Sequence, residues 1–361
     1  AGMTDWGASG RVDSYEFVEV DPFTLEETGR TFDVADGEQS ITWGYYTDNI
    51  ATAKIAVVGA PPEGLIRVRH TVRLPDGTVD CRNLATLFVD GFSGSASSGL
   101  VKRGDACYST LIRFTKESLI NDFAYREGGL LLDDVRAIVE SEGGKLRVLP
   151  GLDGSRAHTR SDFIERDTNK MTALNTLAGW VSWQIGVDPD GYVTVAPYRL
   201  PSEKAVSYTF EAGENCTYVA GYDYSTTRGE VVNRVVVYWS REKDEGDGWG
   251  LTSRVQVELP DERQCSYRRT GRHQSKLIQL DDPTGDDEMR AIGQRYLDEN
   301  GAIDYITIQH VGIPGLQVGD VVRYINDADG SSPIDWLCMV TEIDMKLGRA
   351  AMCTSKLKVM R

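Results

Sequence analysis

Residues 165–198 most constrain what this chain can fold into, because they combine a helix signal with a hairpin signal. Asp167 and Thr168 are candidate N-cap residues, since their side chains can accept hydrogen bonds from the first free N–H groups of a helix. The apolar residues that follow recur at helical spacing: Met171, Leu174, Leu177, Ala178 and Val181. We therefore predict a helix over residues 168–181.

A β-hairpin is predicted directly after this helix, over residues 183–197. Residues 183–187 and 192–195 are rich in side chains that favour strands. Between them, Asp188-Pro-Asp-Gly191 has proline where a turn fixes φ and glycine where φ can be positive. Nothing in this unit has an obvious catalytic pattern, so we expect it to be structural.

Strand patterns dominate the rest of the chain. Residues 12–90 alternate apolar and polar side chains between short turns, which is typical of a small barrel or sandwich. Residues 106–200 mix helices and short strands, and strands resume from residue 204 around a helix over 285–300. With 361 residues, two to four domains are expected, mainly β with α+β insertions.

Composition narrows the functional classes. The formal net charge of −16 disfavours sequence-specific or bulk binding to nucleic acid, because an acidic surface repels phosphates. Six scattered cysteines form neither a disulfide framework nor a zinc pattern. No apolar run approaches the ~20 residues that span a bilayer, and no signal peptide is visible. Ala1 and Gly2 precede Met3, which we expect to be the natural first residue.

Catalytic signatures are weak. The four histidines are isolated, so a zinc hydrolase is not expected. Gly91-Phe-Ser-Gly-Ser95 is similar to the nucleophile elbow of serine hydrolases but lacks its glycine spacing and its strand-to-helix context. A glycosidase pair could lie among the 55 carboxylates, although an acidic surface explains them more simply.

Two acidic turns leave a choice between calcium binding and turn chemistry. They contain Asp188 with Asp190, and Asp327 with Asp329. Neither has the full twelve-residue calcium loop, so we favour hairpin turns. We accordingly predict no catalytic, cofactor-binding or metal-binding residues and no enzymatic activity. Trp239 and Trp249 flank a charged loop over 241–250, which keeps a sugar- or protein-binding surface open, although a packed Trp239 is the simpler interpretation.

Several motifs follow one another in a familiar order. A helix with the core Ala-Leu-Asn-Thr-Leu-Ala (173–178) leads into the Val-Asp-Pro-Asp-Gly-Tyr-Val-Thr-Val hairpin (187–195). The next motifs along the chain are Tyr222-Asp-Tyr and Val-Val-Asn-Arg-Val-Val-Val (231–237). They are followed by a helix that carries Arg290 and Arg295-Tyr-Leu. Pro-Gly-Leu-Gln-Val-Gly-Asp-Val-Val (314–322) then enters a strand. This order resembles the baseplate hub or tail-tip proteins of bacteriophage tails, the tail-associated or late-control proteins, and their relatives in contractile injection systems.

The resemblance implies two β-barrel tube-type domains with smaller α+β domains attached. On this basis residues 1–105 are an N-terminal β-barrel tube domain and 106–200 an α+β insertion domain. Residues 201–240 would supply strands that complete the first barrel. Residues 241–361 would form the second β-barrel region around the inserted helix 285–300. The chain stops at Arg361 directly after its last predicted strand, so no C-terminal host-binding or wall-degrading extension is expected.

The resemblance also implies a function and partners. Three chains would form a ring that joins the hexameric tail tube to a threefold tip and lets DNA pass through its lumen. Partners would be a tail tube or distal tail protein, a spike or receptor-binding protein, and the tape measure protein. The protein would be located in the virion tail, after assembly in the cytoplasm of the bacterial host. The alternatives are a tail-tip module that binds host carbohydrate or protein, and a tail-associated cell-wall hydrolase.

Overall fold

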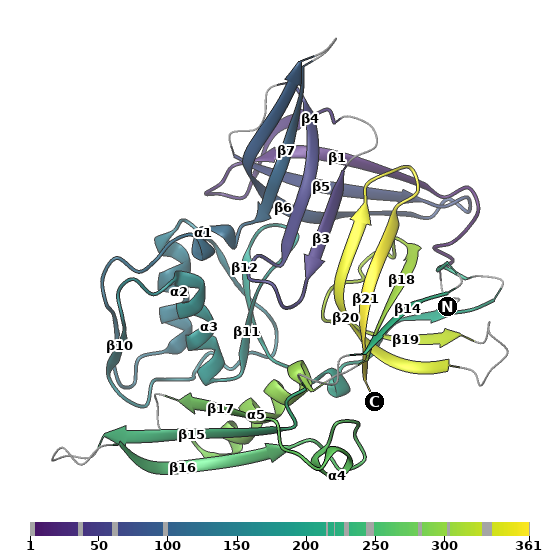
Figure 1. Cartoon of the computed structure of the whole chain (residues 1–361). Coiled ribbons are helices and arrows are strands. Elements are labelled where there is room, and N and C mark those ends of the chain that lie inside the picture. The colour runs from purple at the N-terminus through teal and green to yellow at the C-terminus, as the bar shows by residue number, and fades with distance from the viewer. Residues whose placement is uncertain are drawn as a thin grey trace.

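The computed structural model describes residues 4–34, 39–59, 64–96, 100–213, 216–219, 221–226, 231–242, 249–280, 284–301, 304–326 and 334–360. Figure 1 shows four parts: strands at both ends of the chain, a helical part beside them, and a sheet with one long helix. The fold is mainly β with α+β insertions, which confirms the predicted fold class.

The first β region, drawn purple to blue in Figure 1, is built from antiparallel strands in the order β3-β4-β7-β6-β5-β1-β2. Just after β2, the carbonyl of Asp33 accepts the N–H of Val58, the last residue of β4, at 2.8 Å, and Val34 forms a bridge with Val57. These contacts curl the sheet back on itself. The strands are β1 (Val12–Val20), β2 (Glu27–Phe32), β3 (Ser40–Gly44), β4 (Ala51–Val58), β5 (Leu65–Arg73), β6 (Val79–Ala96) and β7 (Leu100–Ser109).

The second β region combines strands from before and after the sheet with the long helix. They are β13 (Val206–Glu211), β14 (Asp223–Thr226), β18 (Asp304–Val311), β19 (Val321–Asn326), β20 (Ile334–Lys346) and β21 (Met352–Met360). In β18 every second residue is buried, as expected for a strand with one face on a core. β20 also pairs antiparallel with β3, from Glu342 opposite Gly44 to Lys346 opposite Ser40. The two β regions therefore form one 13-stranded sheet.

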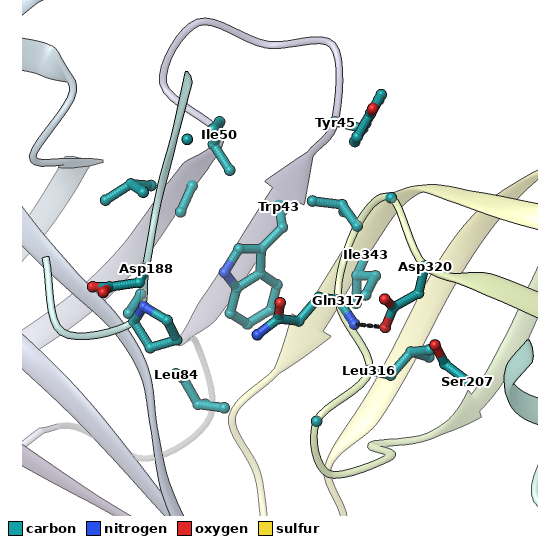
Figure 2. A pocket seen from close by; sticks show the side chains of 18 of the residues that line it. Trp43, Tyr45, Ile50, Leu84, Asp188, Ser207, Leu316, Gln317, Asp320 and Ile343 are labelled. Carbon is teal, nitrogen blue, oxygen red and sulfur yellow. Dashed lines mark hydrogen bonds between the residues drawn. The ribbon is translucent and has the colours of Figure 1, made fainter. Parts of the chain in front are cut away.

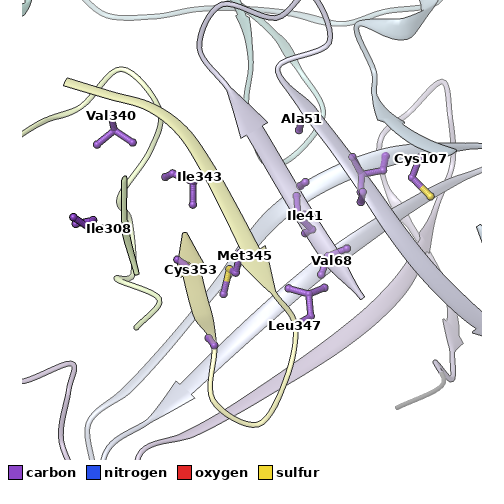
Figure 3. Close-up of a cluster of buried hydrophobic side chains, with 14 of the residues drawn as sticks. Ile41, Ala51, Val68, Cys107, Ile308, Val340, Ile343, Met345, Leu347 and Cys353 are labelled. Carbon is purple, nitrogen blue, oxygen red and sulfur yellow. The ribbon is translucent and has the colours of Figure 1, made fainter. Parts of the chain in front are cut away.

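One hydrophobic core underlies this shared sheet. Ile41 of β3 and Val68 of β5 lie beside Met345 of β20 and Cys353 of β21, together with Leu347 (Figure 3). All five side chains are buried. Because a core packs like a solid, the two β regions are held together by side chains as well as by strand pairing.

The α+β unit lies between β7 and β13 in the chain. Its helices pack on a three-stranded sheet in which β12 pairs antiparallel with β11 and parallel with β9. Its elements are α1 (Ile112–Thr115), β8 (Phe123–Tyr125), α2 (Leu131–Ser141), β9 (Leu146–Val148), β10 (Asp162–Ile164), α3 (Lys170–Trp180), β11 (Trp183–Val187) and β12 (Val193–Pro197). The single-turn helix η1 (Pro201–Glu203) follows it.

Helix α3 and the β11–β12 hairpin confirm the predicted helix and hairpin, but the predicted cap is wrong. Asn169 is the N-cap, and its Oδ1 accepts hydrogen bonds from the N–H groups of Met171 and Thr172. Asp167 instead adopts a positive φ of 66° before the helix. Asparagine caps a helix as well as aspartate does, so residue type alone did not distinguish Asn169 from the two predicted cap residues before it.

The sheet–helix unit consists of β15 (Arg234–Glu242), β16 (Trp249–Glu258), α4 (Tyr267–Thr270), β17 (Ser275–Leu280) and α5 (Asp286–Asn300). α5 confirms the helix predicted over 285–300. The sheet has the strand order β16-β15-β17, so β15 is its central strand. The buried Met289 and Leu297 of α5 pack on Val235 and Val237 of β15. Gly293 allows this close approach, since a Cβ there would lie 2.8 Å from a methyl group of Val257. The unit thus has a core of its own.

The strand partners of residues 201–240 correct one prediction. These strands were expected to complete the first barrel. Instead β13 pairs with β19 and β14 with β18, both in the second β region, while β15 pairs with β16 and β17. An alternating pattern tells which face of a strand is buried, but it does not name the neighbouring strand.

None of the described helices is long and apolar enough to cross a membrane.

Candidate functional site

A groove of about 1070 Å³ lies where the two β regions and the α+β unit meet. In Figure 2, Asp188 stands on one side, Gln317 and Asp320 on the other, and the indole of Trp43 between them. The two walls are the turns around 188–191 and 314–320, which the sequence distinguished as separate motifs. The structure brings them to opposite sides of one space.

The first wall is the tight turn of the β11–β12 hairpin. Gly191 has a φ of +93°, and its N–H donates to the carbonyl of Asp188 at 3.0 Å. The carboxylate of Asp188 accepts the N–H of Tyr192 at 2.9 Å. These are the contacts that turn chemistry requires of aspartate and glycine.

This turn is fastened to the first β region by side chains of that region. Thr86 donates to the carbonyl of Pro189 at 2.8 Å, and Arg67 donates to the carbonyl of Asp190 at 2.9 Å. Thr110, just after β7, donates to the carbonyl of Gly191 at 2.9 Å. The turn is therefore a docking element. No sequence signal could have identified these partners, because threonine and arginine on a strand look like an ordinary solvent face.

The two aspartates of the turn are held by cations and amides of the chain. Arg147 donates to both carboxylates, and its guanidinium lies 3.9 Å from the ring centroid of Tyr192. Burial raises the pKa of Asp188, and its hydrogen bond from Tyr192 and the charge of Arg147 only partly oppose this effect. The pKa of Asp190 is lowered, because the hydrogen bonds that its carboxylate accepts from Asn83 and Arg147 outweigh the effect of burial, which would raise it.

These contacts favour the turn interpretation over calcium binding for Asp188 and Asp190. Within the described ranges, no group of three or more His, Cys, Asp or Glu side chains is arranged to hold a metal ion. Asp327 and Asp329 of the second acidic turn lie outside the described residues.

The second wall is the turn that enters β19. Gly319 has a φ of +87°, and a Cβ there would lie 2.7 Å from the ring of Tyr45. The carboxylate of Asp320 accepts the N–H of Gln317 at 2.9 Å, and Lys204 donates to the carbonyl of Gly319 at 2.9 Å. Burial raises the pKa of Asp320 and lowers the pKa of Lys204, while their opposite charges partly offset both shifts.

Polar groups that line the groove are hydrogen-bonded within the chain. Its three lining carboxylates, Asp188, Glu203 and Asp320, each accept at least one hydrogen bond from within the chain. The lining histidine His70 contacts Asp13 at 2.7 Å, and His310 contacts Ser355. The lining hydroxyl of Ser207 hydrogen-bonds the carboxylate of Asp320, and this carboxylate also accepts the N–H of Gln317. It is therefore engaged within the chain and does not stand as the free base that nucleophilic catalysis requires.

The other residues considered from the sequence are not gathered at this groove. β6 runs through residues 91–95, so Ser93 stands on a strand and not on the strand-to-helix turn of a nucleophile elbow. Trp239 is half-buried against the core of the sheet–helix unit, as the simpler interpretation predicted. The loop that Trp239 and Trp249 flank lies outside the described residues over 243–248.

Comparisons of the whole structure find phage and prophage tail proteins. The tail protein from Neisseria meningitidis MC58 has a TM-score of 0.65 at 14% sequence identity, and the alignment covers 97% of both chains. The 43 kDa tail protein of prophage MuSo2 from Shewanella oneidensis has a TM-score of 0.62 at 13% identity, covering 95% of this chain and 98% of that chain. Prophage tail protein gp18 from Listeria monocytogenes EGD-e has a TM-score of 0.57 at 13% identity, covering 96% and 94%.

The sequence alone finds no such relatives: no protein-family model and no curated protein matches it. The similarity is therefore one of fold, and it extends over nearly the whole length of each chain compared. The chain has the fold of phage tail proteins, which confirms the resemblance predicted from its motifs.

Proposed function

We propose that this chain is a structural hub protein of a phage tail or a related injection system. Three copies form a ring that joins the hexameric tail tube to the tail tip, and DNA passes through the ring. The observation that supports this proposal is the match to tail proteins over 97% of both chains for the first of them. This match covers the complete arrangement of parts in both chains rather than one shared domain.

The proposed division of the chain follows its strand pairing. The first β region corresponds to the tube domain expected over 1–105, extended to Ser109 by β7. The α+β unit corresponds to the insertion expected over 106–200. The second β region would be the second barrel, and the sheet–helix unit is a separate insertion within it. β20 and β3 then join the two barrels edge to edge in each copy.

The charge of the chain suits a passage for DNA. Three copies would carry three times the formal charge of −16, and an acidic lumen repels the phosphate backbone and keeps it from sticking. The partners proposed are a tail tube or distal tail protein, a spike or receptor-binding protein, and the tape measure protein. The protein would be located in the virion tail after assembly in the bacterial cytoplasm.

A role without catalysis fits the groove, whose carboxylates are engaged by cations and N–H groups of the same chain. In an active site, by contrast, perturbed carboxylates are aimed at a substrate.

Light scattering coupled to size exclusion, with negative-stain electron microscopy, tests the proposal on the full chain. We expect a particle of three chains with a central hole. A second measurement asks whether that particle caps the end of purified tail tubes. A monomer at every concentration that also leaves tube ends bare would contradict the proposed function.

A further inference from the structure

A strongly basic patch stands out on this acidic chain. Residues 261–273 contain Arg263, Arg268, Arg269 and Arg272 against two carboxylates, although the whole chain has a net charge of −16. We call Arg268, Arg269, Arg272 and the neighbouring Tyr267 the basic patch. These four residues are exposed and lie on and just after α4, at the lower end of Figure 1.

The arginines of the basic patch are exposed to solvent, and most of their charge is not balanced by ion pairs with described residues. Arg268 reaches only Asp261, at 3.4 Å, and its side chain is 76% exposed. Arg269 and Arg272 take part in no ion pair with any described residue. Tyr267 is 48% exposed and stacks on His273 with 3.9 Å between ring centroids, which holds the phenol ring in place. Fixed tyrosine and arginine side chains are the residues that most often carry binding energy in protein interfaces.

The same chain carries a complementary surface on its α+β unit. Residues 117–122 run beside 165–168, because the N–H of Leu119 donates to the carbonyl of Thr168 and that of Asp167 to the carbonyl of Leu119. Four exposed carboxylates stand there against a single cation, Arg166. Ile120 is 85% exposed among them. We call this the acidic patch; its carboxylates belong to Glu117, Asp122, Glu165 and Asp167.

We infer that the basic patch of one copy docks on the acidic patch of the next copy. None of the described ion pairs joins the two patches within one chain, and they lie on different parts of the molecule, the sheet–helix unit and the α+β unit. Two complementary patches at different places on one chain make a head-to-tail contact, which closes into a ring when the rotation between copies permits. This inference rests on the proposed function and names the surfaces that hold its ring together.

Opposite charges of this kind set the rate and the specificity of association, and they respond to salt. The buried centre of the contact would be Tyr267 against Ile120. Association of the wild-type chain is therefore expected to weaken at about 0.5 M NaCl, where the Debye length shrinks to a few ångströms.

Paired charge reversal tests the contact in sedimentation experiments on the full chain. One variant reverses the basic patch by Arg268→Glu with Arg269→Glu, and a second variant reverses the acidic patch by Glu117→Arg with Glu165→Arg. Each variant alone is expected to weaken association about tenfold or more. All four changes together restore opposite charges and are expected to recover association. The matched control combines Arg136→Glu, at a partly exposed site, with Arg290→Glu, at an exposed site. Both sites lie outside the two patches, and this variant is expected to associate like the wild type.

The outcomes separate this inference from the proposed function. If the wild type forms rings and neither reversal weakens them, or if the fourfold variant fails to recover, the docking is wrong and the hub function stands. If the wild type stays monomeric and leaves tube ends bare, both fail. Rings that persist in the Arg268→Glu, Arg269→Glu variant, together with loss of its binding to a single-stranded oligonucleotide, would assign the basic patch to nucleic acid and overturn the docking.

Discussion

His310 shows how one buried side chain gives the fold a pH limit. It is 1% exposed in the core of the second β region, beside the ring of Phe210. Its Nδ1 lies 2.7 Å from the carbonyl of Val311 and its Nε2 2.8 Å from the hydroxyl of Ser355. Burial lowers the pKa of His310 to about 4, so the folded protein keeps this ring neutral at neutral pH.

We expect this histidine to destabilise the protein in mild acid. Between pH 6.5 and about 4 the unfolded chain binds a proton at His310 and the folded chain does not. The free energy of unfolding therefore falls as the pH falls through this window, by about 3 kcal/mol at most. Urea unfolding at several pH values measures it. His310→Gln should show a shallower fall than the wild type, and equal slopes would contradict the prediction.

Lys358 acts in the opposite pH range. Its side chain is buried, and its ammonium donates to the carbonyl of Asp298 near the end of α5 and to the hydroxyl of Tyr46 at 3.3 Å. Burial lowers the pKa of Lys358 to about 8, although the charges of Asp298 and Glu299 oppose this shift. The lysine sits where the sheet–helix unit meets the second β region.

The stability of the wild type is therefore expected to rise from pH 8 to 9.5. There the unfolded chain keeps its proton on Lys358 while the folded chain loses it, which adds about 1 kcal/mol per pH unit. Tyr46, which is 48% exposed, and half-buried Tyr198 have pKa values raised by partial desolvation and act only above pH 10, where free tyrosine ionises. Cys353, whose pKa burial raises to about 12, keeps its proton in the folded chain while the unfolded thiol loses it, so it reduces the net rise above about pH 9. Lys358→Met should abolish the rise in urea unfolding, and a rise that persists in this variant would point to another group.

At the scale of elements, local chemistry could be predicted from the sequence and docking could not. The helix α3 and the β11–β12 hairpin follow from spacing, capping and turn residues that lie close together in the chain. The contacts that fasten the hairpin turn come from Arg67, Thr86 and Thr110, up to 123 positions away. A polar side chain on a strand carries no mark that it will bind a distant carbonyl.

Substitution of Gly191 tests how much the contacts between the hairpin turn and the first β region contribute to the stability of the fold. Its φ is +93°, and a Cβ there would lie 3.1 Å from Thr86 and 3.3 Å from Thr110. Gly77 has a similar φ of +89° in an open turn with nothing within 4 Å of a Cβ. Gly77→Ala should cost about 1 to 2 kcal/mol of backbone strain. Gly191→Ala should cost the same strain and in addition displace the turn.

Thermal or urea unfolding of the two variants gives the comparison directly. We expect Gly191→Ala to be the less stable by at least about 1 kcal/mol, a typical loss when packing is forced apart. Equal losses in the two variants would show that the turn does not depend on its contacts with the first β region.

For the whole molecule, the mainly β class could be predicted, but the pairing of distant strands could not. β3 and β20 are about 300 positions apart, and β13 and β19 run parallel across an intervening unit. Alternation of apolar residues fixes which face of such strands is buried and leaves their neighbours open. The same limit led the strands of 201–240 to be assigned to the first barrel.

The groove and the charged patches were beyond sequence reasoning for the same reason. Each wall of the groove is a turn whose local shape was foreseen, and only the folded sheet sets the two walls face to face. The basic residues of 263–272 were visible in the sequence. Their exposure depends on α4 lying outside the core of the sheet–helix unit.

The arrangement of cores predicts how the molecule opens. One core runs through both β regions, whereas the sheet–helix unit has a separate core. Met345 and Met289 are buried in the first and the second of these cores, at 5% and 0% exposure. Shortening either to alanine removes the same side-chain atoms and should cost about 2 to 5 kcal/mol of local stability.

Hydrogen exchange followed by mass spectrometry distinguishes the two variants, because exchange reports the cooperative unit in which each amide opens. Met345→Ala is expected to speed exchange in β1–β7 and in β18–β21 together, since these strands share a sheet and a core. Met289→Ala is expected to speed exchange in β15–β17 and α5 alone. Faster exchange confined to β18–β21 in Met345→Ala would mean that the two β regions open independently. In that case the β3–β20 pairing would be a weak joint and not the rigid link between two barrels that the proposed ring requires.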